Sequence, residues 1–168
     1  TACVFAAILL IILAVGATRL VDALELVSGV SQQNNRGGVM DNFAIRGFLG
    51  TPDGGAEYYV DGFLANRGMA PPRDPVTAER IEVLKGPSAT LFGRGSTGGV
   101  INEVTKRAQM GAITAGTLSF GTDATKRLTI DENVSSHSLG GSAIRLNAMV
   151  HDAGLAGIDD AHMLRYGV

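Results

Sequence analysis

The 168-residue chain is poor in cysteine, tryptophan and charge. It contains one cysteine, Cys3, and its charged fraction of 18% lies below the roughly 25% usual for soluble domains. A single cysteine excludes a disulfide framework and a cysteine-based metal site within the chain. The 14 basic and 16 acidic residues nearly balance, which argues against a broad cationic surface for nucleic acid.

Glycine is the residue type in excess. The chain holds 23 glycines in 168 residues, about twice the usual share of roughly 7%. The glycines follow no strict period, which excludes a collagen-like chain, and the hydrophobic fraction of 45% argues against disorder. A glycine-rich and moderately apolar sequence predicts many tight turns between short strands.

The densest glycine cluster lies in "GPSATLFGRGSTGGVIN" at 86–102, where 93–98 spells G-x-G-x-x-G. A dinucleotide-binding loop with this spelling needs a helix directly after it, whose N-terminus faces the pyrophosphate. The strand-like residues 100–105 follow instead, and no Walker A lysine is present. The sequence therefore predicts structural turns rather than a phosphate site. The residues predicted for turns are Gly47, Asp61, Gly62, Gly86, Pro87, Gly93, Gly95, Gly98 and Gly99.

No pattern of catalytic residues stands out. The three histidines, His137, His151 and His162, lack the spacing of a helical zinc motif. The sequence also has no Gly-x-Ser-x-Gly nucleophile elbow. We expect a protein that is not an enzyme and that holds no catalytic metal or cofactor.

The N-terminus carries twelve consecutive apolar residues at 4–15. This run is shorter than the roughly 18 to 20 residues that a membrane-spanning helix needs, and no lysine or arginine precedes it. We interpret 1–15 as the remnant of a signal or pro-segment, or as a buried strand or helix. A membrane anchor is a third alternative.

A helix of about ten residues is predicted next, because Leu20, Leu24 and Val27 form one apolar stripe. Thr18 is its expected N-cap and Gly29 its expected stop. The polar stretch that follows, "SQQNNRGGVMDN", is interpreted as a loop.

Short strands and turns are predicted from 42 to 85. "NFAIRGF" and "RIEVLK" are typical of strands, and "YYVDGFL" has an Asp-Gly pair between two apolar stubs, which predicts a hairpin. Asp74 and Pro75 can open a single helical turn as N-cap and first residue.

The sequence changes character after residue 112. In "AIRLNAMVH", the apolar Ile144, Leu146 and Val150 alternate with polar residues, and "TLSF" and "RLTID" alternate more weakly. Strands of this kind occur in membrane β-barrels, where the apolar side meets lipid, and also in soluble sandwiches.

Four stretches resemble, in their order and spacing, the plug domain of TonB-dependent outer-membrane receptors, in the siderophore-receptor branch. They are "GATRLVDALELVSGVS", "NFAIRGF", "YYVDGF" and the run "ERIEVLKGPSATLFGRGSTGGVINEVTKR", with "LSFGTDATKRLTID" and the C-terminal residues resembling the first barrel strands. The resemblance implies an α+β plug domain of short mixed strands and short helices at 16–108. Antiparallel strands of an incomplete outer-membrane β-barrel follow at 109–168.

The resemblance also implies a function in the bacterial outer membrane, where the plug gates the barrel lumen during active uptake of iron–siderophore complexes. At roughly 10 residues per strand, a barrel of about 22 strands needs on the order of 220 residues. Only 60 residues follow residue 108, so we expect a fragment of such a receptor. A free-standing, plug-like periplasmic binding or partner protein without transport activity is the alternative.

In such receptors the outward loops of the plug help to bind the ferric siderophore. The matching loops here are 49–57, 64–73 and 92–94. The residues expected to contact ligand are Tyr58, Phe63, Asn66, Arg67, Met69, Arg73, Phe92 and Arg94. For each arginine the alternative is a solvated loop charge or a contact to the barrel wall. Arg46, Arg80, Glu82 and Lys85 are expected to form plug–barrel contacts.

Two departures from the family pattern concern energy coupling and packing. No stretch before Gly16 resembles the TonB box, through which the TonB–ExbB–ExbD complex acts on full-length receptors. Glu103 stands where an apolar or amide residue is more usual, and we expect it to face the interface between plug and barrel.

Overall fold

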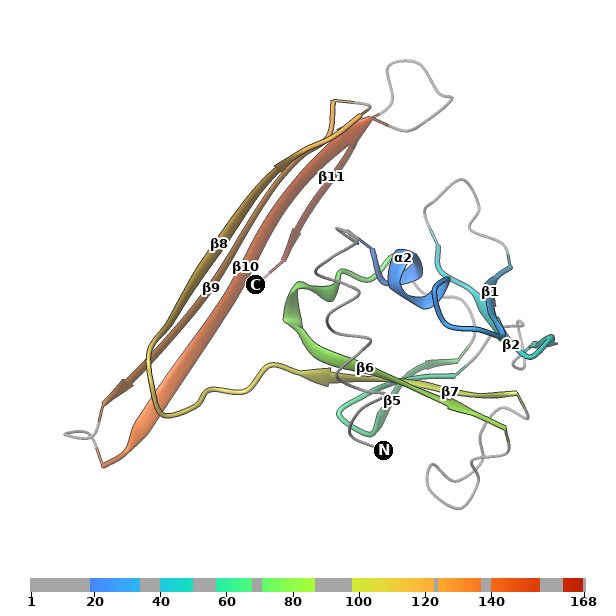
Figure 1. Ribbon diagram of the computed structural model, residues 1–168, viewed down its shortest axis with the longest axis horizontal. Coiled ribbons are helices and arrows are strands. Elements are labelled where there is room, and N and C mark those ends of the chain that lie inside the picture. The colour runs from blue at the N-terminus through green and yellow to red at the C-terminus, as the bar shows by residue number, and fades with distance from the viewer. Residues whose placement is uncertain are drawn as a thin grey trace. The chain divides into compact units, whose positions relative to one another are not determined.

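The computed structural model describes residues 19–33, 40–49, 57–67, 71–86, 98–122, 124–136, 140–154 and 162–167 (Figure 1). The chain divides into two compact units, Thr1–Thr105 and Lys106–Val168. Within the described ranges the fold consists mostly of strands, with one short α-helix and one 3-10 turn. No helix in these ranges has the length and apolar character needed to cross a membrane.

The first unit is built on a four-stranded mixed sheet with the order β5-β4-β7-β6. β4 pairs with β5 in antiparallel and with β7 in parallel orientation, and β6 pairs with β7 in antiparallel orientation. Its strands are β4 (Glu57–Val60), β5 (Phe63–Arg67), β6 (Ala78–Lys85) and β7 (Gly99–Thr105).

A smaller antiparallel sheet and two short helical segments complete the first unit. The sheet has the order β1-β2-β3, with β1 at Val30–Gln32, β2 at Phe43–Ile45 and β3 at Phe48–Leu49. The helix α2 covers Leu20–Leu24, and the 3-10 turn η1 covers Pro75–Thr77.

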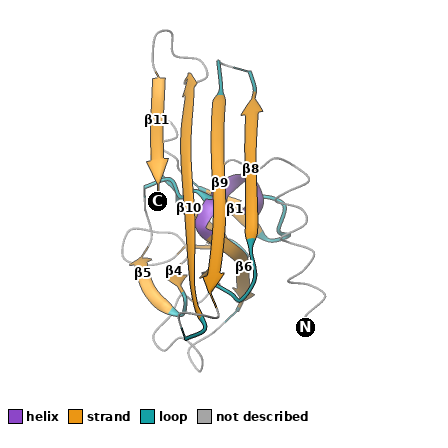
Figure 2. Ribbon diagram, turned by 90° about the vertical axis from the view of Figure 1, so that its left-hand side faces the viewer, coloured by secondary structure: helices purple, strands orange, loops and turns teal. Residues whose placement is uncertain are grey.

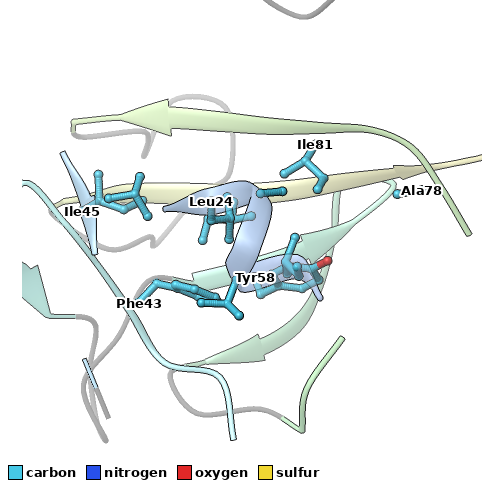
Figure 3. Close-up of a cluster of buried hydrophobic side chains, with 11 residues drawn as sticks. Leu24, Phe43, Ile45, Tyr58, Ala78 and Ile81 are labelled. Atoms are coloured by element: carbon cyan, nitrogen blue, oxygen red, sulfur yellow. The ribbon is translucent and has the colours of Figure 1, made fainter. Parts of the chain in front are cut away.

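The core lies where α2 and the small sheet pack on one face of the larger sheet. Figure 3 shows Leu24 of α2, Ile45 of β2 and Ile81 of β6 within one cluster of buried side chains. Leu24, Ile45 and Ile81 are each at most 1% exposed. Burial of an aliphatic side chain of this size contributes about 1.5–3 kcal/mol, so these contacts hold the elements together.

The predicted hairpin and single helical turn are present. Asp61 and Gly62 adopt φ of 50° and 84° between β4 and β5, the left-handed pair of a two-residue hairpin turn. The Asp61 carboxylate accepts hydrogen bonds from Thr105 N and Thr105 Oγ1, at 3.0 and 2.6 Å. The Asp74 carboxylate caps η1 by accepting from Val76 N at 3.0 Å.

The glycine pair that opens β7 is required by close packing. Gly99 has a φ of 139°, and a Cβ atom there would lie 2.0 Å from the carbonyl oxygen of Leu84. A Cβ atom on Gly98 would lie 2.6 Å from the carbonyl oxygen of Ile45. Both positions therefore bring backbone against backbone, which only glycine allows.

The second unit is one antiparallel sheet with the order β11-β10-β9-β8 (Figure 2). Its strands are β8 (Ile113–Phe120), β9 (Lys126–Ser136), β10 (Ser142–Gly154) and β11 (His162–Gly167). The register places Leu118 opposite Leu128, and Leu128 opposite Val150, on one face.

The apolar face of this second sheet is exposed. Leu118, Val134 and Ile144 are 64%, 58% and 76% exposed, whereas Asn133 and His151 on the other face are buried. The strands and their alternation were predicted from the sequence, and the exposure shows that the apolar face does not pack on a core within the unit.

The predicted ten-residue helix is wrong in length. The α-helix ends at Leu24 because the next amides form tighter turns: Val27 N donates to the Leu24 carbonyl and Val30 N to the Val27 carbonyl. These turns deliver the chain into β1, which occupies part of the stretch interpreted as a loop. The expected cap Thr18 and the apolar run 1–15 lie outside the described residues.

Candidate functional site

Three connections reach the same end of the four-stranded sheet. Glu57 lies opposite Arg67 and Val100, and Lys85 lies opposite Gly99, so these strand ends are neighbours. The segments 50–56, 68–70 and 87–97 join the sheet at these strand ends. Gly86 N donates to the Gly98 carbonyl at 2.8 Å and closes the base of the third connection. We call this end of the sheet the loop end.

The residues predicted to contact ligand fall into several groups. Asn66 and Arg67 lie on β5 at the loop end. Phe63 is 79% exposed and lies beside the Asp61–Gly62 turn, at the other end of the sheet, and its contact with a ligand remains a prediction. The predicted residues outside the described part of the chain are Met69, Pro87, Phe92, Gly93, Arg94 and Gly95.

Arg73 is the predicted ligand-binding arginine whose surroundings are described best. Its guanidinium carbon lies 3.8 Å from the centroid of the Tyr58 ring, a cation–π contact. Its backbone is fixed on both sides: Arg73 N donates to Asp41 Oδ2 at 3.1 Å, and Leu20 N donates to the Arg73 carbonyl at 2.9 Å. Arg73 Nε is buried and has no hydrogen-bond partner among the described residues.

Tyr58 lies beneath Arg73 and belongs to the core. It is 4% exposed, and its hydroxyl donates to the carboxylate of Glu103. Burial first, and then the negative charge of Glu103, raise the pKa of Tyr58 well above its ordinary value. The hydroxyl therefore stays protonated and engaged inside the unit, so Tyr58 is corrected from a ligand contact to a support for Arg73.

Glu103 also differs from the expectation. It is 6% exposed in the interior of the first unit, where its carboxylate accepts from Tyr58 and, at 3.0 Å, from Thr77 Oγ1. The two hydroxyl donors compensate for the burial of the carboxylate, so it needs no place at an interface. Sequence reasoning missed this contact, because the tyrosine and the glutamate are separated by 45 positions.

The face of the larger sheet that points away from Tyr58 and Glu103 carries a second chain of polar contacts. Arg80 Nε donates to Glu82 Oε1 at 2.8 Å, and Asn102 Nδ2 donates to Glu82 Oε2 at 2.9 Å. Asn102 Oδ1 accepts from Gly62 N at 3.0 Å and so ties the hairpin turn to β7. Arg80 and Glu82 thus pair with each other, and their contacts with a barrel remain a prediction.

The other two residues predicted at a barrel interface lie near the small sheet. Lys85 Nζ donates to the carbonyl of Ser28, and Arg46 is exposed in the turn between β2 and β3 with a φ of 53°. Arg46 N donates to the Gly29 carbonyl at 2.6 Å. Both contacts lie within the first unit, and any approach to a barrel remains a prediction.

The chemistry available at Arg73 is electrostatic recognition. The segment that carries Arg73 runs to Thr77 and Ala78, at the end of the sheet opposite the loop end. In the described ranges, no group of three or more histidine, cysteine, aspartate or glutamate side chains could hold a metal ion directly. A supported guanidinium is suited to an anionic partner, because it presents several N–H donors in a fixed plane.

Comparisons with known proteins agree with this architecture. A family model for the TonB-dependent receptor plug domain matches residues 11–100. The chain is 40% identical over 135 residues to the metal-pseudopaline receptor CntO of Pseudomonas aeruginosa, covering 80% of this chain and 18% of that protein. It is 33% identical over 157 residues to the catecholate siderophore receptor Fiu of Escherichia coli, covering 91% of this chain and 20% of that protein.

Solved structures resemble the chain as well. The closed form of Fiu from Escherichia coli matches with a TM-score of 0.76 and 30% identity, covering 94% of this chain and 22% of that chain. The siderophore receptor PiuA of Acinetobacter baumannii matches with a TM-score of 0.71 and 28% identity, covering 90% of this chain and 21% of that chain. The chain spans about a fifth of the length of the curated relatives it matches.

Proposed function

The chain belongs to the TonB-dependent receptor family through its plug domain, and from this premise we propose that it serves uptake of iron–siderophore complexes. In this proposal it supplies the plug, at 16–108, and the first barrel strands, at 109–168, of an outer-membrane receptor. The plug closes the barrel lumen, and its loop end helps to bind the ligand. No catalytic step and no resident cofactor are part of the proposal, and iron enters only within the ligand.

The observation that carries the proposal is the gathering of three loop connections at one end of the plug sheet. Strand ends that are far apart in the chain, Glu57, Arg67, Lys85 and Gly99, are brought together there by the strand register. Relatives of this chain are named as receptors for a metal–pseudopaline complex and for catecholate siderophores. An anionic metal chelate is the class of ligand that Arg67, Arg73 and Arg94 would attract.

The exposed apolar face of the second sheet supports an outer-membrane location. Leucine, isoleucine and valine side chains alternate there with polar residues, as on strands that face lipid on one side and a polar lumen on the other. Among the described strands, β8 and β11 each pair on one side only. In a membrane such edges need further strands, which supports a larger barrel.

Energy for transport is assigned in the proposal to the TonB–ExbB–ExbD complex, in keeping with the family. The second partner is the ferric siderophore itself.

The test uses Fiu of Escherichia coli as a host, with residues 19–168 of this chain replacing the matching segment. The chimera is expressed in cells without catecholate receptors of their own, and growth is measured with iron supplied only as a ferric tris-catecholate. We expect growth that depends on TonB. A chimera that inserts in normal amounts and yet gives no TonB-dependent growth would contradict the proposal.

A further inference from the structure

Arg73 is held in place without a carboxylate partner among the residues that the structure describes. Among the described residues no carboxylate forms an ion pair with its guanidinium, and its Nε atom has no hydrogen-bond partner. The neighbouring Asp41 carboxylate accepts from the backbone amide of Arg73 instead. A half-buried guanidinium with spare donors gains most from a partner that brings negative charge.

The support beneath Arg73 is a chain of three buried contacts. The Tyr58 ring lies 3.8 Å below the guanidinium, its hydroxyl is held by Glu103, and Glu103 also holds Thr77 at the other end of the segment 73–77. Because Glu103 accepts from both hydroxyls, one side chain fixes the tilt of the ring and the path of the backbone that carries Arg73.

We propose that Tyr58 and Glu103 are positioning residues, which hold the Arg73 guanidinium ready for an anionic metal chelate. This inference rests on the proposed function, because it concerns the ligand of the proposed receptor. It assigns specificity to a pair that never touches the ligand: the ring orients the cation, and the carboxylate orients the ring.

The chemistry of a guanidinium predicts that the site distinguishes metal chelates by their net charge. A trianionic iron(III) tris-catecholate would gain from Arg73, whereas a neutral iron(III) tris-hydroxamate would gain little. Loss of one charge-assisted contact corresponds to roughly 10- to 100-fold in affinity. The effect of a Tyr58 variant should disappear once Arg73 is removed, since both act through the same cation.

The first measurement tests positioning in the 168-residue chain itself, by nitrogen–proton NMR in detergent micelles. A guanidinium over an aromatic ring gives an upfield-shifted Arg73 Hε resonance. We expect this shift in the unaltered chain, its loss in Tyr58→Leu, and its reduction in Glu103→Ala. Glu103→Gln should restore it, because the amide oxygen still accepts from the tyrosine hydroxyl.

Tyr59 and Glu57 provide matched controls. Tyr59 is also 4% exposed, and its hydroxyl donates to Glu57 Oε2 at 2.9 Å, but it lies on the opposite face of the sheet. Tyr59→Phe and Glu57→Gln should leave the Arg73 resonance in place. An unshifted resonance in the unaltered chain, or equal effects of the Tyr58 and Tyr59 variants, would overturn the positioning role.

The second measurement uses the Fiu chimera and compares its affinity for the two chelates. Arg73→Ala and Tyr58→Leu should each lower the affinity for the tris-catecholate by roughly 10- to 100-fold and change the affinity for the neutral chelate by no more than about twofold. The double variant should show no further loss of affinity. Equal losses for both chelates would overturn the inference. A chimera that transports, but whose chelate affinity is unchanged by every Arg73 substitution, would also overturn the inference and would leave the proposed function standing. A chimera without transport would contradict the proposed function.

Discussion

Glu103 shows how single residues stabilise the plug unit. Its buried carboxylate serves two hydroxyl donors, Tyr58 and Thr77, which come from elements on either side of it. Removal of the acceptor leaves buried donors unsatisfied, and each such group costs about 1–3 kcal/mol. The interior of the plug is therefore sensitive to changes at this position.

A pH-dependent prediction follows from Tyr58. Because its pKa is raised in the folded state, the unfolded chain loses this proton first, and the free energy of unfolding should fall as the pH rises above about 10. Below that pH, the protonated Tyr58 hydroxyl makes its full contribution to the free energy of unfolding. Urea unfolding at a series of alkaline pH values should show this fall, and Tyr58→Phe should flatten it. A Tyr58→Phe profile that matches the unaltered chain would contradict the assignment.

Gly99 gives a steric prediction. A Cβ atom there would lie 2.0 Å from the Leu84 carbonyl oxygen at a φ of 139°, so Gly99→Ala should lower the free energy of unfolding by more than about 2 kcal/mol. The control is Gly116→Ala, since the nearest atom to that Cβ lies 3.5 Å away and the residue has no positive φ. Similar urea midpoints for the two variants would argue against the clash.

At the scale of elements, the connection from β7 to β8 is fixed by the second sheet. Asn133 of β9 is fully buried, and its side-chain amide donates to the carbonyls of Gln109 and Gly111 at 2.8 and 2.6 Å and accepts from Gln109 N at 3.1 Å. Gly111 N donates to Ser135 Oγ at 2.9 Å, and Arg145 donates to the Arg107 carbonyl at 3.2 Å. The connection therefore forms part of the second unit.

These contacts of Asn133 with Gln109 and Gly111, which we call the Asn133 clamp, should protect the Gln109 amide from hydrogen exchange. In Asn133→Ala the Gln109 amide loses its acceptor, and its hydrogen exchange should accelerate by on the order of tenfold. Asn133→Asp keeps the acceptor and loses the two donated bonds, so the effect on the Gln109 amide should be smaller. Exchange rates measured residue by residue in the 168-residue chain test this, and unchanged rates in Asn133→Ala would show that the clamp is not needed.

The elements differ in how far the sequence determines them. Strands with strict alternation, such as that of Ile144 and Leu146, were predictable because a period of two is a local property. The helix was overestimated, because tight turns after Leu24 override a stripe that continues to Val27. The Asn133 clamp and the Tyr58–Glu103 contact were not predicted, because each joins residues at least 22 positions apart. Their only signal in the sequence was a polar residue within a strand.

For the whole molecule, the two units place their apolar side chains differently. The plug unit buries them in a cluster around α2, whereas the second unit exposes them along one face. A face of this kind is stable only against lipid or further protein.

Leu118 and Thr117 are adjacent on β8 and occupy opposite faces. Arginine on a lipid-facing position costs up to about 2–4 kcal/mol, whereas arginine on a lumen-facing position is tolerated. In the Fiu chimera, Leu118→Arg should reduce the amount of folded, heat-modifiable receptor in the outer membrane, and Thr117→Arg should not. Equal amounts of the two variants would contradict the assignment of the apolar face to lipid.

We propose that this chain forms the plug and the first barrel strands of a receptor that imports ferric chelates. The most direct measurement is the initial rate of labelled-iron uptake from ferric tris-catecholate, in cells that carry the chimera with and without TonB. We expect uptake in the presence of TonB, binding without uptake in its absence, and a reduced apparent affinity in Arg73→Ala. Uptake that is independent of TonB, or a correctly inserted chimera that binds no chelate, would contradict the proposal.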